Sequence, residues 1–161
     1  MNNEQQKVKN IVDLAINKFN DKETYLLENN LSERCICSKF AEYLSIEIES
    51  SEFAAYEVDV EYNRGNHGVE NSPKTLCDQK IVVDLIVHKR GHNNITGFDN
   101  LICIEMKKSN DSRRLQGIRD DEDRLRKLTD YQYSFNYQIG FMIIADIKEK
   151  KLYIRNQFIL D

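Results

Sequence analysis

The sequence predicts an α/β (α+β) fold in which a central mixed β-sheet of about five strands is flanked by helices. Residues 80–89, 101–106 and 138–147 are nearly continuous apolar runs, which are typical of strands covered on both faces. A helical pattern over about 115–131 separates the last two runs. A helix between two buried strands indicates a right-handed crossover, and therefore a sheet with helices on both sides.

Two helices and one strand are expected before these runs. Residues 4–19 place apolar side chains at helical spacing, which predicts an amphipathic first helix. Ser32 can cap a second helix that runs to about residue 48. Residues 56–64 alternate between apolar and acidic side chains, so a half-exposed strand is expected there. The polar segment that follows, with the single proline Pro73, is expected to be a loop.

The later elements complete a predicted order of α-α-β-β-β-α-β-β, with a last strand over 152–160. In the strand 80–89, the alternation places Val83, Leu85 and Val87 on one face and Val82 and Ile86 on the other. The helix after residue 115 should bury one stripe, formed by Leu115, Ile118, Leu125 and Leu128. We expect residues 1–161 to form one domain.

Composition restricts the classes of protein to consider. With 40% hydrophobic and 31% charged residues, the chain is expected to be globular rather than disordered. It has no apolar run of about 18 residues and its N-terminus lacks an apolar signal core, so we expect a cytoplasmic protein without membrane contact. The four cysteines are then expected to be packing residues. The net charge of −4 argues against general coating of nucleic acid, but it is compatible with an acidic metal site beside basic loops.

Charged residues interrupt two of the buried strands. Residues i and i+2 of a strand share a face, so Glu105 and Lys107 project together while Met106 points away. Asp84 lies on the preceding strand, and the polar connection 89–100 is typical of a hairpin. Antiparallel pairing would bring Asp84 beside Glu105. Two carboxylates this close repel each other unless a cation or a proton neutralises them, and Mg²⁺ commonly binds through one or two carboxylates.

Three interpretations of this group remain open at the level of the residues. The protein is a metal-dependent enzyme in which Lys107 orients or deprotonates a water or stabilises the transition state. Alternatively, it is a domain that binds nucleic acid or a protein without cutting. In the third interpretation the acids form a structural salt-bridge network, since an Asp…Glu-x-Lys pattern often occurs by chance.

Four segments resemble, in order, motifs of the PD-(D/E)xK nuclease superfamily, and especially those of a group of small bacterial proteins within it. They read SERCICSKFAEYL (32–44), VDVEYNR (58–64), VDLIVHKRG (83–91) and NLICIEMKK (100–108). The resemblance implies a restriction-endonuclease-like αβββαβ core over about 32–146, after an extra N-terminal helix. One departure is Val83, which stands where the superfamily usually has proline.

The resemblance also implies an activity: a metal-dependent endonuclease that hydrolyses DNA phosphodiester bonds. Asp84, Glu105 and the backbone carbonyl of Met106 would bind Mg²⁺, with Mn²⁺ as a substitute. Lys107 would assist the attacking water. The implied partner is nucleic acid, with DNA as the expected substrate, and a homodimer would allow a second strand to be cut.

The superfamily often adds a glutamate from the first core helix. Glu33 and Glu42 are candidates, and because they lie about two and a half turns apart they face opposite ways. Glu33 lies at the centre of the apolar stripe formed by Ile36, Cys37, Phe40, Ala41 and Leu44. We therefore expect Glu33 at the site and Glu42 in solvent. A structural charge that favours the helix dipole is the alternative for Glu33.

Charged residues outside this group have weaker assignments. Arg64, Lys89 and Arg90 are expected on loops flanking the acids, either as solvated charges or as phosphate contacts for nucleic acid. Asp123 and Lys127 are expected to form an i,i+4 pair on a solvated helix face. The alternative is that one of the two supports the site from the start of that helix.

Overall fold

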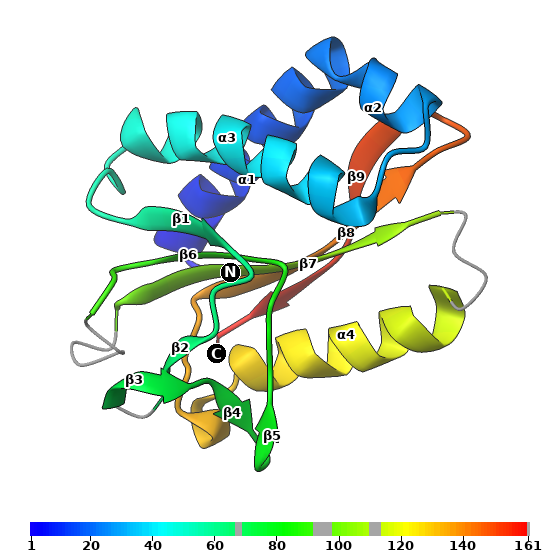
Figure 1. Ribbon diagram of the computed structural model, residues 1–161. Helices are drawn as coiled ribbons and strands as arrows, with labels where there is room; N and C mark the ends of the chain where they lie inside the picture. Colours follow the sequence, from blue (N-terminus) through cyan, green and yellow to red (C-terminus); the bar gives the residue numbers. More distant parts are fainter. Residues whose placement is uncertain (67–68, 92–97, 110–113, 161) are drawn as a thin grey trace.

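The centre of the computed structural model is a five-stranded mixed sheet with the strand order β1-β6-β7-β8-β9 (Figure 1). The structure describes residues 1–66, 69–91, 98–109 and 114–160. The expected α+β class and the sheet of five strands are confirmed. The strands are β1 (Glu57–Val60), β6 (Leu85–His88), β7 (Asn100–Lys108), β8 (Ile139–Asp146) and β9 (Lys151–Ile159).

Helices cover both faces of this sheet (Figure 1). On one face lie α1 (Asn3–Lys22), α2 (Thr24–Glu28) and α3 (Glu33–Glu49), and on the other lies α4 (Arg114–Leu128). A 3₁₀ turn, η1 (Tyr131–Tyr133), follows α4. The elements α3, β1, β6, β7, α4 and β8 follow one another in the expected αβββαβ order, with small hairpins between β1 and β6.

Strand pairing agrees with the predicted crossover. β1 and β6 are antiparallel, as are β6 and β7. β7 and β8 are parallel, and β8 and β9 are antiparallel. A parallel pair cannot be joined by a tight turn, and α4 supplies the long connection between β7 and β8.

Two apolar cores explain why the central strands are apolar on both faces. In β7, Ile102, Ile104 and Met106 pack in the core under α1 and α3, whereas Cys103 packs in the core under α4. β8 divides in the same way, with Ile143 on the first side and Ile144 on the second. Each strand therefore buries alternate residues in different cores.

The start of β6 differs from the prediction. Val83 packs with Ile86 in the α4 core, not with Leu85 and Val87. The regular strand begins only at Leu85 because the chain before it leaves the sheet toward the hairpins, so simple alternation does not extend back to residue 80. Val82 is accordingly exposed.

The segment expected to be a polar loop contains two small hairpins. One pairs β2 (Arg64–Asn66) with β3 (Val69–Pro73), and the other pairs β4 (Thr75–Leu76) with β5 (Gln79–Lys80). These strands have too little apolar alternation to be read from the sequence. Lys74, between the two hairpins, is buried and anchors this region by donating a hydrogen bond to the Tyr137 hydroxyl at 2.6 Å.

The apolar stripe of α4 is confirmed at three of four positions. Ile118, Leu125 and Leu128 are buried, but Leu115 is 73% exposed because it lies in the first turn, beyond the edge of the core. Asp121 is buried within the same stripe. Among the described residues, no helix is both long and apolar enough to cross a membrane.

Candidate active site

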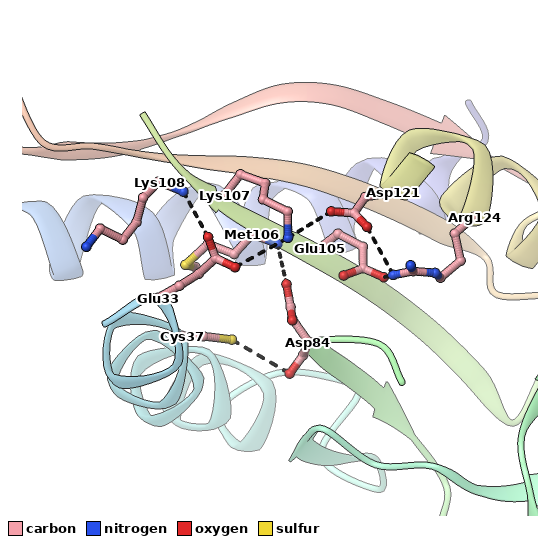
Figure 2. Close-up of polar contacts among 9 residues, drawn as sticks. All are labelled: Glu33, Cys37, Asp84, Glu105, Met106, Lys107, Lys108, Asp121 and Arg124. Atoms are coloured by element: carbon pink, nitrogen blue, oxygen red, sulfur yellow. Dashed lines mark hydrogen bonds and ion pairs between the residues drawn. The ribbon is translucent and has the colours of Figure 1, made fainter. Parts of the chain in front are cut away.

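Acidic and basic side chains from three elements meet where β6 begins and β7 ends (Figure 2). Asp84 immediately precedes β6, Glu105 and Lys107 lie on β7, and Glu33 is the first residue of α3. α4 adds further charges from the opposite side of β7 (Figure 2). The structure thus brings together all four side chains that the sequence assigned to the site.

Asp84 and Glu105 are neighbours across two antiparallel strands. Leu85 pairs with Ile104, so the next positions in this register are Asp84 and Glu105. Oδ2 of Asp84 accepts a hydrogen bond from the backbone N–H of Met106 at 2.8 Å. Glu105 is only 1% exposed. Burial and the nearby charge of Asp84 raise the pKa of Glu105 well above its usual range, against the opposing effect of Arg124.

The backbone of Met106 faces the same edge of the strand as Asp84. Its N–H points to the Asp84 carboxylate, and the N–H and C=O of one strand residue point to the same side. Strand geometry therefore directs the Met106 carbonyl toward Asp84. Its side chain points the other way, into the core under α1 and α3.

Glu33 turns toward the sheet, as the helical arc predicts. Its Oε2 accepts from the backbone N–H of Lys108 at 3.0 Å, and its Oε1 accepts from Nζ of Lys107 at 3.3 Å. Ser32 caps the helix by accepting from the backbone N–H of Cys35, which fixes Glu33 in the first turn. Glu42 is exposed and pairs with Lys39 at 2.6 Å, away from the site.

Lys107 is held between two carboxylates. Its Nζ lies 2.9 Å from Oδ2 of Asp121 and 3.3 Å from Oε1 of Glu33, and its aliphatic stem passes over Gly117 of α4. Burial lowers the pKa of Lys107, but the two carboxylates outweigh it and raise this pKa overall, so the side chain is an ammonium at neutral pH. Lys108 lies on the opposite face, where its Nζ donates to the backbone carbonyl of Leu31 at 2.7 Å.

Sequence reasoning missed two residues of α4. Arg124 donates a hydrogen bond from Nη1 to Oε1 of Glu105, and the same nitrogen lies 3.1 Å from Oδ1 of Asp121 (Figure 2). Asp123, which the sequence analysis named as an alternative support for the site, instead pairs with Lys127 at 2.7 Å on an exposed face. The available signal was the position of Asp121: it lies three residues after Ile118 and four before Leu125, inside the apolar stripe.

The structure places two of the three basic residues expected to flank the acids at the other end of β6 from Asp84. Lys89 and Arg90 follow the last residue of β6, so the length of this strand separates them from Asp84. Nε of Arg90 donates to Oδ2 of Asp59 at 2.8 Å, and Nζ of Lys89 lies 4.9 Å from the ring centre of Tyr56. Arg64 is exposed. Contact of these residues with nucleic acid stays a prediction.

Two hollows give access to the site. A cleft of about 290 Å³ lies between the start of α3 and the end of β1, and Glu33, Cys37, Glu61 and Asp84 line it. A second hollow of about 440 Å³, here called the α4 groove, lies between α4 and the β4–β5 hairpin. It is lined by Lys80, Val82, Asp120, Asp123, Arg124 and Lys127, among others. Asp84 is thus reached from one side and Arg124 from the other.

The donor set suits a hard divalent cation, although the acids are paired within the chain. No group of three or more His, Cys, Asp or Glu side chains in the described ranges is arranged to hold a metal. Asp84 and Glu105 nevertheless offer adjacent carboxylates, the ligand type that Mg²⁺ prefers. Oδ2 of Asp121 is buried without a hydrogen bond, because its contact with Lys107 has the distance of an ion pair but not the angles of a hydrogen bond. These residues therefore fit Mg²⁺ if the internal pairs rearrange.

Comparison of the chain with models of protein families, with curated proteins and with solved structures finds no match.

Proposed function

We propose that the protein is a Mg²⁺-dependent endonuclease that hydrolyses DNA phosphodiester bonds. One observation carries this proposal: Asp84, Glu105 and Lys107 lie together where β6 begins and β7 ends, with Asp84 lining a cleft, in the element order that the PD-(D/E)xK resemblance implies. Buried charges are costly unless they have partners or a purpose. Glu33 joins them from α3, as the same resemblance implies.

The residues have separable roles in this reaction. Asp84, Glu105 and the Met106 carbonyl would hold Mg²⁺, which when bound would polarise the phosphate and activate a water. Lys107 acts as an ammonium, because its raised pKa keeps it protonated. It therefore orients the water and stabilises negative charge on the phosphate in the transition state, rather than acting as a base. Glu33 accepts a hydrogen bond from Lys107 and positions it.

A second candidate function is binding of nucleic acid without cleavage. The acids are paired within the chain, since Arg124 contacts Glu105 and Lys107 contacts both Asp121 and Glu33, which is compatible with a structural salt-bridge network in a domain that does not cleave. A domain of this kind would need no cation at the acids. Metal binding and cleavage therefore separate the two functions.

The test measures Mn²⁺ binding by calorimetry and cleavage of plasmid, linear and single-stranded DNA in Mg²⁺ and Mn²⁺. We compare the wild type with Asp84→Asn and Glu105→Gln. Both substitutions remove a charge but keep an oxygen, so the contacts with the Met106 N–H and with Arg124 have an acceptor. Asp123→Asn is the matched control, because Asp123 is an exposed acid on α4.

We expect both site variants to lose the saturable Mn²⁺ site and cleavage, and the control to keep them. DNA binding without cleavage in the wild type would support the second candidate. Mn²⁺ binding that is unchanged in Asp84→Asn would contradict the proposed metal site.

A further inference from the structure

We propose that Arg124 competes with the catalytic cation for Glu105 and turns away into the α4 groove when that cation binds. The inference rests on the proposed function, because it takes Glu105 as a metal ligand. It adds a regulatory role for a residue of α4 that neither the motifs nor their spacing indicates.

The contacts of Arg124 place a positive charge directly on the proposed ligand. Its Nη1 donates a hydrogen bond to Oε1 of Glu105, whose side chain is 2% exposed. The side chain of Arg124 is 28% exposed and lines the α4 groove. Arg124 therefore connects a buried carboxylate with a solvent-accessible hollow.

The pairing has a clear electrostatic cause. Glu105 is buried, and Nη1 of Arg124 contacts both its carboxylate and the carboxylate of Asp121, so the guanidinium lies between two acids. A buried carboxylate without a partner is strongly destabilising. Arg124 thus neutralises Glu105, as a divalent cation at this carboxylate would.

Two cations cannot share this carboxylate without cost. A guanidinium at hydrogen-bond distance from Glu105 would repel a divalent cation held between Glu105 and Asp84. Binding of the cation through Oε1 would therefore release Arg124 from that oxygen. By linkage, the arginine weakens cation binding by the same free energy with which the cation weakens the arginine contact.

The structure provides a destination for the released side chain. Asp120 lines the α4 groove together with Arg124. Asp121 contacts Nη1 of Arg124 already, at 3.1 Å. Arg124 can thus be released from Glu105 and still contact another carboxylate. This contact lowers the free-energy cost of the release.

The first test compares Mn²⁺ affinities by calorimetry for the wild type, Arg124→Gln, Arg124→Lys and Arg126→Gln. Arg124→Gln should bind Mn²⁺ about tenfold or more tightly, the scale on which one adjacent charge shifts a carboxylate equilibrium. Arg124→Lys keeps the charge and should bind like the wild type. Arg126→Gln is the control for removing an exposed arginine from the same helix, because the Arg126 side chain is 65% exposed. It should leave the affinity unchanged.

The variants also separate competition from a purely structural role. If Arg124 only supports the fold of the site, Gln and Lys should both weaken Mn²⁺ binding, and this result would overturn the inference. Thermal unfolding followed by circular dichroism confirms that each variant is folded. Arg124→Lys keeps a cation beside Glu105, so it provides a folded comparison.

A second test follows Arg124 itself. In ¹⁵N-labelled wild-type protein, the Nε–Hε signal of Arg124 is identified by its absence in Arg124→Lys. A Mg²⁺ titration should shift this signal with the same midpoint as cation binding. A signal that does not move at saturating Mg²⁺ would overturn the inference.

The outcomes distinguish this inference from the proposed function. Equal Mn²⁺ affinity in the wild type and Arg124→Gln, with binding lost in Asp84→Asn, would reject competition and leave the nuclease site intact. Mn²⁺ binding by Arg124→Gln but not by the wild type would support competition. No binding by either protein would reject both proposals.

Discussion

Lys107 and Asp121 form an ion pair of 2.9 Å that joins the end of β7 to α4. The same ammonium lies 3.3 Å from Oε1 of Glu33 at the start of α3. One lysine therefore connects elements that cover opposite faces of the sheet (Figure 2). Because two carboxylates hold it, its ammonium lies in a defined place between α3 and α4.

Removal of this ammonium should lower the rate of cleavage but leave metal binding intact. We expect Lys107→Met to lower the cleavage rate at saturating Mn²⁺ by about 10²–10³, the usual loss when one group that stabilises the transition state is removed. Methionine retains an apolar stem to pack over Gly117. Calorimetry should show that Mn²⁺ binding survives, because a protonated lysine has no lone pair for a metal.

Lys108→Met is the matched control for this prediction. Lys108 lies on the other face, where it donates to the backbone carbonyls of Asn30 and Leu31. Its removal should cost about 1 kcal/mol of stability and leave most of the cleavage activity. Equal cleavage rates for Lys107→Met and the wild type would reject the mechanism proposed for Lys107.

Lys74 should make the stability of the protein depend on pH in the alkaline range. Burial lowers its pKa from 10.5 to about 8. Between these values the unfolded chain holds a proton on Lys74 that the folded chain releases. The free energy of unfolding contributed by this group therefore rises with pH from about 8 to 10.5, by about 3 kcal/mol at most.

The measurement is urea unfolding of the wild type and Lys74→Met at several pH values from 7 to 10.5. The difference in unfolding free energy between the two proteins isolates Lys74 from other groups that titrate. This difference should shift in favour of the wild type as the pH rises. A constant difference would show that Lys74 keeps its proton throughout.

Gly140 sets how closely α4 approaches the sheet. A Cβ at this position of β8 would lie 3.2 Å from Sγ of Cys103, 3.3 Å from Cγ2 of Thr129 and 3.4 Å from Cδ2 of Leu125. Because all three neighbours are packed in the core, we expect Gly140→Ala to destabilise the fold by about 1–3 kcal/mol. Urea unfolding measures this, and an unchanged midpoint would mean that α4 shifts freely.

The β4–β5 turn carries strain that a substitution should relieve. Its two central residues, Cys77 and Asp78, have φ values of 50° and 62°, as a two-residue type I′ turn requires. Asparagine adopts this conformation more readily than cysteine. Cys77 is exposed, so Cys77→Asn should stabilise the protein by about 0.5 kcal/mol without loss of packing.

Cys35→Asn is the matched control for the turn. Cys35 is also exposed but lies in α3, where cysteine and asparagine have similar helix propensities. Its substitution should leave the urea midpoint nearly unchanged. The same stabilisation in both variants would point to the loss of a thiol rather than to relief of the turn.

Local patterns were enough to predict the main helices, the strands of the central sheet and the pair of acids. Apolar runs identify β7 and β8, because strands buried on two faces have little need of polar residues. Alternation in β7 places Glu105 and Lys107 on one face, and a hairpin from β6 brings Asp84 beside them. The helical arc of α3 likewise places Glu33 toward the sheet. Each of these inferences needs only residues that are close in sequence, or that lie on strands consecutive in the chain.

Only the packing of the whole chain determined the partners of these charges. The run RDDEDR (119–124) offers four acids, and local spacing favoured Asp123. The rotation of α4 on the sheet instead buries Asp121 and brings Arg124 to Glu105. That rotation depends on contacts between residues distant in sequence, including the fit of Leu125 against Gly140. Which basic side chain pairs with Glu105 therefore depends on how α4 packs on the sheet. The local spacing of residues does not predict that packing.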